Sequence, residues 1–216
     1  MESTLSAGAG EPGLRLIETL AWDGARFLRL ARHLARLERS AAALGWGCDR
    51  AVALAALRAA APGGPARMRL TLAGPGSGPG RVEVTAAALP AVAGRWRLGL
   101  AGARLASDDP WLRVKSTRRA AYDAARAGLA AGIDEVLFLN ERGEVCDGTI
   151  TTVFFDAGTG LCTPPLSCGL LPGVLREEML AQGRCGEAVL RGDDLARVRL
   201  WVGNSLRGRI PADWAG

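Results

Sequence analysis

The spacing of apolar residues changes several times along the chain, and each change predicts a different element. Residues 16–20 are typical of a strand, and Asp23-Gly24 signals a hairpin turn before a return strand from Phe27. Between residues 29 and 44, apolar side chains recur every three or four positions, which predicts a helix with one apolar face. A second, alanine-rich helix is expected over residues 49–61. The first part of the chain therefore mixes strands and helices.

The remaining pattern is mostly that of strands. Strands are expected at 67–72, 81–87, 96–105, 135–140, 144–146, 151–156, 161–163 and 198–202. Helices are expected from a cap at Thr117 to residue 131, and over 174–182. A loop is expected at 74–80 and a linker at 89–94. We therefore predict an α+β fold, with a small N-terminal α+β domain at residues 1–92 and a larger C-terminal domain at 93–216.

Composition narrows the class of protein. Of the 216 residues, 49% are hydrophobic, which is enough for a sizeable core, and no apolar run approaches the ~20 residues of a membrane span. The first residues lack the pattern of a signal peptide, so we expect a cytoplasmic protein without a membrane partner. Five cysteines without C-x-x-C spacing and a single histidine predict reduced thiols and no metal site.

The charge pattern favours a small anionic ligand over nucleic acid. The net charge is +5 and the isoelectric point is about 9.4, but the arginines are interleaved with acidic residues instead of forming one patch. Aromatic residues make up 5% of the chain, so surfaces on which bases could stack are scarce. We therefore predict no nucleic-acid partner, although a non-catalytic basic binding module is kept as a remote alternative.

Lys115 is the one lysine among 27 basic residues. An arginine guanidinium keeps its proton in proteins, whereas a lysine amine can lose it and then attack a carbonyl to form a Schiff base. Drift of the composition toward arginine, which leaves one lysine by chance, is the alternative and is favoured by the count alone. The lysine count alone therefore allows covalent chemistry without requiring it.

The other chemical signals are spread along the chain. It contains no P-loop, no G-x-G-x-x-G after a strand, no H-E-x-x-H and no G-x-S-x-G. Besides the lysine, it has Asp147 at the end of a predicted strand and Pro172-Gly173 before a predicted helix. Pyridoxal phosphate needs an amine for its aldehyde, an acid for its pyridine nitrogen and amide donors for its phosphate. These residues could supply all three.

An ordered set of short motifs resembles the class IV aminotransferases, the fold type IV group of pyridoxal-phosphate enzymes. The motifs are Glu18-Thr19, Arg36-Leu37, Lys115, Asp134-Glu135-Val136, the run from Gly143 to Thr149, Thr163-Pro164-Pro165 and the run from Leu171 to Arg176. The runs that begin at Lys115 and Ser167 are most similar to 4-amino-4-deoxychorismate lyase modules. The resemblance implies a two-domain fold like that of D-amino-acid aminotransferase, with a shortened N-terminal domain, a homodimer and an amino-acid-like substrate.

The resemblance also implies residue roles. Lys115 would be the catalytic Schiff-base lysine, Arg36 the phosphate-binding arginine and Asp147 the acid at the pyridine nitrogen. The remaining cofactor contacts would come from Val174, Leu175, Ser205 and Leu206, and the substrate candidates are Arg207, Asn204 and Arg118. For the arginines, a solvated surface role is the alternative.

Three features depart from the family pattern. The pyridine-nitrogen acid is usually a glutamate, which is one methylene longer than Asp147. An asparagine five residues beyond that acid is replaced by Thr152, and the usual segment before Glu18 is missing.

The predicted reaction is pyruvate elimination from aminodeoxychorismate to give p-aminobenzoate, a step of folate biosynthesis. Amino-group transfer by a branched-chain or D-amino-acid aminotransferase uses the same residues and is the alternative.

Overall fold

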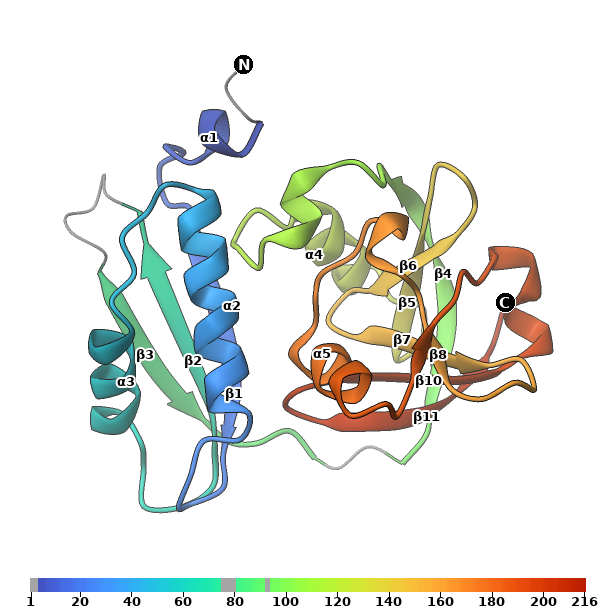
Figure 1. Cartoon of the computed structure of the whole chain (residues 1–216). Coiled ribbons are helices and arrows are strands. Elements are labelled where there is room, and N and C mark those ends of the chain that lie inside the picture. Colours follow the sequence, from blue (N-terminus) through green and yellow to red (C-terminus); the bar gives the residue numbers. More distant parts are fainter. Residues whose placement is uncertain (1–3, 75–80, 92–93) are drawn as a thin grey trace. The chain divides into compact units, whose positions relative to one another are not determined.

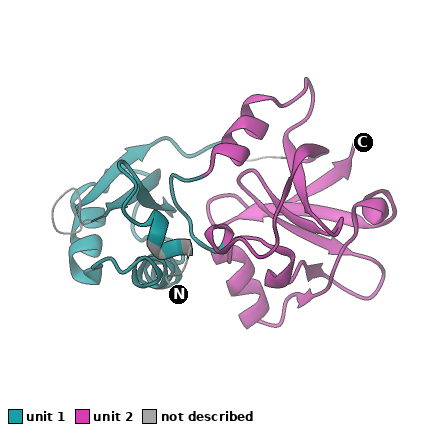
Figure 2. Cartoon of the chain, turned by 90° about the horizontal axis from the view of Figure 1, so that it is seen from above, with its two compact units in different colours: residues 1–91, 113–118 teal, residues 92–112, 119–216 magenta. Residues whose placement is uncertain are grey.

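The structure, a computed structural model, describes residues 4–74, 81–91 and 94–216 (Figure 1). Most of the loop expected at 74–80, and residues 92–93 of the expected linker, lie outside the described residues. The chain forms two compact units, Met1–Ala91 with Arg113–Arg118, and Val92–Leu112 with Arg119–Gly216 (Figure 2). The single boundary expected near residue 92 therefore does not account for Arg113–Arg118, which belongs to unit 1.

Unit 1 contains a three-stranded antiparallel sheet in the order β1-β2-β3. Its strands are β1 (Arg15–Trp22), β2 (Ala66–Ala73) and β3 (Val82–Ala87). Met68, Leu70 and Leu72 alternate with more exposed residues along β2 and are at most 1% exposed, as expected for a strand with one face in a core. Phe27 makes one bridge to Trp22 instead of starting the predicted return strand.

Among its described residues, unit 1 has three helices, α1 (Thr4–Gly8), α2 (Leu30–Ala43) and α3 (Arg50–Ala59), and the two longer ones pack on this sheet. Helix α2 contacts β1, and α3 contacts β2 and β3. The apolar spacing predicted both longer helices, and Asp49 caps α3 by accepting hydrogen bonds from the Ala51 and Val52 amides.

Unit 2 contains a closed ring of six strands (Figure 1). They are β4 (Trp96–Leu105), β5 (Glu135–Asn140), β6 (Val145–Gly148), β7 (Thr152–Asp156), β10 (Arg199–Asn204) and β11 (Gly208–Trp214). The strands pair in the order β10-β11-β4-β5-β6-β7, and β7 also pairs with β10, which closes the ring. Leu98, Leu137, Val153 and Val202 belong to one core cluster in this unit and are each fully buried.

Short elements complete unit 2. They are β8 (Cys162–Thr163), β9 (Gly186–Glu187), α4 (Ala120–Ala127), α5 (Val174–Ala181) and three 3₁₀ turns at Pro110–Arg113, Leu166–Cys168 and Gly192–Arg197. Helix α4 is shorter than predicted at both ends: its N-cap is Arg119 and not Thr117, and it ends at Ala127 and not at residue 131. No described helix is long and apolar enough to span a bilayer.

Candidate active site

Lys115 lies beside the edge strand of the sheet in unit 1. The Lys115 carbonyl accepts a 2.8 Å hydrogen bond from the Ile17 amide, and the Thr117 amide donates 2.9 Å to the Arg15 carbonyl. Ser116 also forms an antiparallel bridge with Leu16. The backbone on both sides of Lys115 is thus fixed to β1. The half-buried lysine side chain therefore extends from a fixed position on the backbone.

Strand β1 and helix α2 enclose a buried cluster of Glu18, His33 and Arg36. These residues are 2%, 1% and 4% exposed, respectively. Arg36 Nε donates 2.8 Å to Glu18 Oε1 and its Nη2 donates 2.7 Å to Oε2, while His33 Nδ1 lies 2.6 Å from Oε2. The paired contacts hold the Arg36 guanidinium in one orientation. Arg36 is therefore not a solvated residue of the helix surface, which was the alternative from the sequence.

Burial and charge oppose each other within this cluster. Burial alone would raise the pKa of Glu18, but the Arg36 charge and the hydrogen bonds from Arg36 and His33 outweigh it and lower that pKa to about 2. Burial lowers the pKa of His33, and the positive charges of Arg36 and Lys115 lower it further. Glu18 raises this pKa through its hydrogen bond and its negative charge, but its effect is smaller. The cluster therefore favours an ionised Glu18 beside a neutral His33 at neutral pH.

Asp147 lies in unit 2, on β6, and is 6% exposed. Its Oδ2 accepts a 3.2 Å hydrogen bond from the Leu171 amide. Burial raises the pKa of the Tyr122 phenol, and the negative charge of Asp147 adds to this effect. Asp147 is therefore a buried acid with a backbone donor of its own.

The strand register brings further predicted positions next to Asp147. Asp147 pairs with Thr152 on β7, and Thr152 pairs with Gly203 on β10. A Cβ atom at Gly203 would lie 3.0 Å from the Leu175 Cδ2 atom of α5. Side-by-side pairing of three strands thus gathers in unit 2 residues that are far apart in the sequence.

Helix α5 begins at Val174, and its N-cap is Gly173, which has no side chain to cap the first amides. Amides in the first turn of a helix have no intrahelical acceptor, so they can donate to an anion. Arg176 in the same turn is 3% exposed, donates to the Pro164 carbonyl and pairs with Glu187. The start of α5 therefore offers uncapped amide donors to an anion, and Arg176 anchors the helix.

The loop after β10 is organised by Asn204. Its Oδ1 accepts hydrogen bonds from the Leu206 amide at 3.0 Å and the Arg207 amide at 2.9 Å, and its Nδ2 donates 3.1 Å to the Ile150 carbonyl. The Leu206 amide, predicted to meet a phosphate, thus already has an acceptor. Ser205 is 6% exposed in the same loop.

The predicted substrate residues have structural contacts. Asn204 organises the loop just described, and the Arg207 guanidinium lies 5.7 Å from the centre of the Trp96 ring. Arg118 pairs with Glu11 at 2.8 Å, and both side chains are nearly half exposed. These contacts favour a supporting role for Asn204 and a surface ion pair for Arg118.

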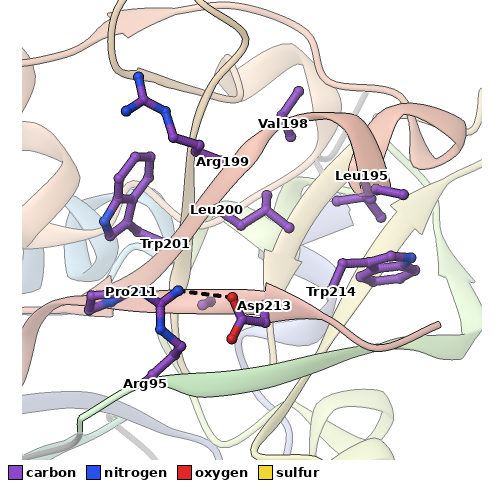
Figure 3. A pocket seen from close by; sticks show the side chains of 11 residues that line it. Arg95, Leu195, Val198, Arg199, Leu200, Trp201, Pro211, Asp213 and Trp214 are labelled. Atoms are coloured by element: carbon purple, nitrogen blue, oxygen red, sulfur yellow. Dashed lines mark hydrogen bonds and ion pairs between the residues drawn. The ribbon is translucent and has the colours of Figure 1, made fainter.

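A cavity of about 410 Å³ opens in unit 2 along β10 and β11 (Figure 3). None of its lining residues is a predicted site residue, and it offers no lysine. Figure 3 shows that Arg95 pairs with Asp213, and the two side chains lie 2.8 Å apart. Arg199 pairs with Asp156, which lies outside the cavity lining. Since both arginines already have carboxylate partners, we do not assign this cavity to the cofactor.

Gly173 gives a test of this geometry. A Cβ atom there would lie 2.6 Å from Thr152 Oγ1, but 3.8 Å from Thr152 Cβ. Gly173→Ala should therefore lower the free energy of unfolding by about 1–3 kcal/mol through overpacking. The double variant Gly173→Ala/Thr152→Ala should recover most of this loss, because the colliding hydroxyl is removed.

Urea unfolding measures both effects. Gly47→Ala is a suitable control, because nothing lies within 4 Å of a Cβ atom at Gly47. If the single and double variants lose the same free energy of unfolding, the Thr152 hydroxyl is not the group that a side chain at residue 173 collides with.

Comparisons with known proteins agree with this arrangement of strands. A family model described as amino-transferase class IV matches residues 15–213. The chain therefore belongs to the class IV aminotransferase family, which confirms the predicted fold type IV architecture and a pyridoxal-phosphate-dependent class of enzyme. No curated protein matches the chain.

The solved structures that are similar to this chain include aminotransferases and a lyase. A protein from Mesorhizobium loti, named as a candidate amino-acid aminotransferase, is 47% identical, with a TM-score of 0.87 over 94% of this chain and 100% of that one. The 4-amino-4-deoxychorismate lyase of Pseudomonas aeruginosa is 25% identical, with a TM-score of 0.82 over 99% and 87%. The PLP-bound form of a hypothetical Mycobacterium tuberculosis aminotransferase is 24% identical, with a TM-score of 0.78 over 97% and 83%.

Proposed function

We propose that this chain binds pyridoxal phosphate through Lys115 and acts on the amino group of a small substrate. The main support is that the one lysine of the chain is fixed by backbone pairing to β1, the strand that carries Glu18. Arg36, oriented by Glu18, would bind the phosphate together with the first amides of α5. When bound, the cofactor supplies an electron sink for a carbanion at the substrate carbon.

The donor set fits this cofactor. It comprises an amine, an oriented guanidinium, a buried carboxylate and a helix start without a side-chain cap. A side chain at Gly173 would collide with Thr152, which explains why the N-cap of α5 is a glycine that leaves the first amides without a side-chain cap. The amine matches the aldehyde, the carboxylate matches the pyridine nitrogen, and the guanidinium and the helix amides match the phosphate.

The residues have distinct proposed tasks. Lys115, once displaced by the substrate amine, would take the proton from the substrate carbon next to nitrogen and later return it. Asp147 would carry a negative charge toward the pyridine nitrogen, while the Leu171 amide stabilises that charge by donating to Oδ2. Because aspartate is shorter than glutamate, this role depends on the backbone position of β6.

For the reaction itself we propose elimination of pyruvate from aminodeoxychorismate. The Asn204-Ser205-Leu206 loop supports this choice, because it resembles the lyase loop more than the Ser/Thr-rich loop of aminotransferases. Lys115 would remove the proton, and aromatisation to p-aminobenzoate would drive departure of pyruvate. Amino-acid aminotransferase activity is the second candidate, favoured by the 47% identity to the Mesorhizobium loti protein.

Two assays on the purified protein separate the reactions. Aminodeoxychorismate with pyridoxal phosphate should release pyruvate, detected by coupled reduction with lactate dehydrogenase. Branched-chain or D-amino acids with a keto acid should give no amino exchange above a protein-free blank. Amino exchange without pyruvate release would reject the lyase and support the aminotransferase. The homodimer and the cytoplasmic location stay predictions.

A further inference from the structure

Glu135 is a buried acid for which the proposed chemistry has no use. It begins β5, is 0% exposed and lies beside Leu98 of β4 in the strand register. Ionised carboxylates are rarely buried completely unless other groups donate hydrogen bonds to them. Its contacts therefore show what it holds in place.

The contacts of Glu135 converge on the turn between β6 and β7. Oε1 accepts from the Thr149 amide at 3.1 Å and from the Thr149 hydroxyl at 2.5 Å. Oε2 accepts from the Ile150 amide at 3.2 Å and from the Thr151 hydroxyl at 3.0 Å. Arg126 Nη1 lies 3.4 Å from Oε1. One carboxylate thus binds donors from three consecutive residues.

Gly148 lets the turn approach this carboxylate. A Cβ atom at Gly148 would lie 3.0 Å from the Glu135 Cδ atom and 2.5 Å from Thr151 Oγ1. Asp147, the preceding residue, is the proposed cofactor acid, and the Asn204 side chain holds the far side of the turn through the Ile150 carbonyl. The backbone position of Asp147 thus depends on a turn that is held from two sides.

We infer that Glu135 is the positioning residue for Asp147, which it acts on through the turn at residues 148–151. The inference rests on the proposed function for Asp147. An amide cannot replace the carboxylate here, because its NH₂ group would face an N–H donor of the turn. Glu135→Gln should therefore shift Asp147 although the two side chains differ only in one terminal group.

The Leu171 amide reports this shift without any cofactor. It donates to Asp147 Oδ2 and has no hydrogen bond to Glu135. In the protein without cofactor, Glu135→Gln should speed hydrogen exchange of the Leu171 amide about tenfold, while amides of β10 and β11 stay unchanged. Thr149→Val, which removes one hydroxyl and keeps the amide, should give a smaller increase and serves if Glu135→Gln fails to fold.

Asp156→Asn is the matched control. Asp156 ends β7, and its Oδ1 accepts hydrogen bonds from the turn amides of Gly158 at 2.7 Å and Gly160 at 3.2 Å. Its replacement should leave exchange of the Leu171 amide unchanged. Unchanged exchange in both Glu135→Gln and Thr149→Val, or an equal increase in Asp156→Asn, would overturn the inference.

Cofactor affinity links the positioning to the site. Titration with pyridoxal phosphate, followed by absorbance, should show about tenfold weaker binding for Glu135→Gln. The double variant Glu135→Gln/Asp147→Asn should bind no more weakly than Asp147→Asn alone, because both changes act through one carboxylate. Additive losses would overturn the inference. If the wild-type chain binds no pyridoxal phosphate, the proposed function fails, whereas the exchange result still decides whether Glu135 positions Asp147.

Discussion

Lys115→Ala is expected to abolish covalent attachment of pyridoxal phosphate and to lower turnover by about a thousandfold or more. The chain has no second lysine that could take over the role. In the wild-type protein, borohydride should reduce the cofactor onto the chain and fix one pyridoxyl group on the peptide that contains Lys115. Mass spectrometry of the intact chain and of its peptides measures this directly.

Lys115→Arg is the matched control for this experiment. It preserves the positive charge and most of the side-chain length, but a guanidinium does not lose its proton and cannot attack the aldehyde. We therefore expect the arginine variant to fail as completely as the alanine variant. A pyridoxyl group that still forms in Lys115→Ala, or attachment at the N-terminal amine alone in the wild type, would contradict the assignment of Lys115.

Arg36 shows what spacing along a helix can and cannot predict. The sequence placed Arg36 among arginines that recur along one helix, and only the family resemblance distinguished it from the others. In the structure it is 4% exposed, because Glu18 on β1 binds its guanidinium. Helical periodicity carries no information about a partner on a strand, so the environment of Arg36 required the tertiary structure.

Strand β11 shows a second limit. The sequence pattern predicts no strand beyond residue 202, and Gly208 and Pro211 are residue types that are rare inside strands. The structure forms β11 over Gly208–Trp214, and its pairing with β4 begins at Ala212, after the proline. The parallel pairing therefore does not need the missing proline N–H. Closure of the ring depends on this long-range pairing, which the local sequence pattern does not encode.

The sequence was most informative where a residue type is chemically unusual. Lys115 and the Pro172-Gly173 helix start were predicted from their chemistry, and α5 begins at Val174 as expected. In the sequence, Glu135 stands out only as part of a family motif, because a polar residue at the start of a strand resembles many surface positions. Its full burial and its contacts with the turn were not predictable from strand alternation.

Glu18→Gln is expected to lower the free energy of unfolding by about 3–5 kcal/mol at neutral pH, because it removes one partner of a buried ion pair. Arg36, 4% exposed, would keep its charge without the carboxylate that now binds two of its nitrogen atoms. Urea unfolding measures the loss. Glu83→Gln is the matched control: its pair with Arg15 is at the surface, so its removal should cost about 0–1 kcal/mol.

The same cluster predicts an acid-sensitive fold. The pKa of Glu18 is about 2 in the folded protein against a usual value of 4.5, so its contribution is present above pH 4.5 and is lost as pH falls toward 2. The pKa of His33 is also lowered, so below its usual value of 6.5 the unfolded chain binds more protons, and stability falls with pH there too. The Glu18 carboxylate contributes about 3 kcal/mol to the free energy of unfolding above pH 4.5. In Glu18→Gln, which lacks this carboxylate, the free energy of unfolding should fall less as the pH drops below 4.5.

A double variant separates the stability of the cluster from its proposed function. Buried ion pairs can often be replaced by apolar side chains of similar volume without loss of stability. Glu18→Leu/Arg36→Met should therefore recover most of the free energy of unfolding that Glu18→Gln loses. It should not recover affinity for pyridoxal phosphate, because the guanidinium proposed to bind the phosphate is absent. A stable double variant that binds the cofactor as tightly as the wild type would show that Arg36 serves the fold and not the phosphate.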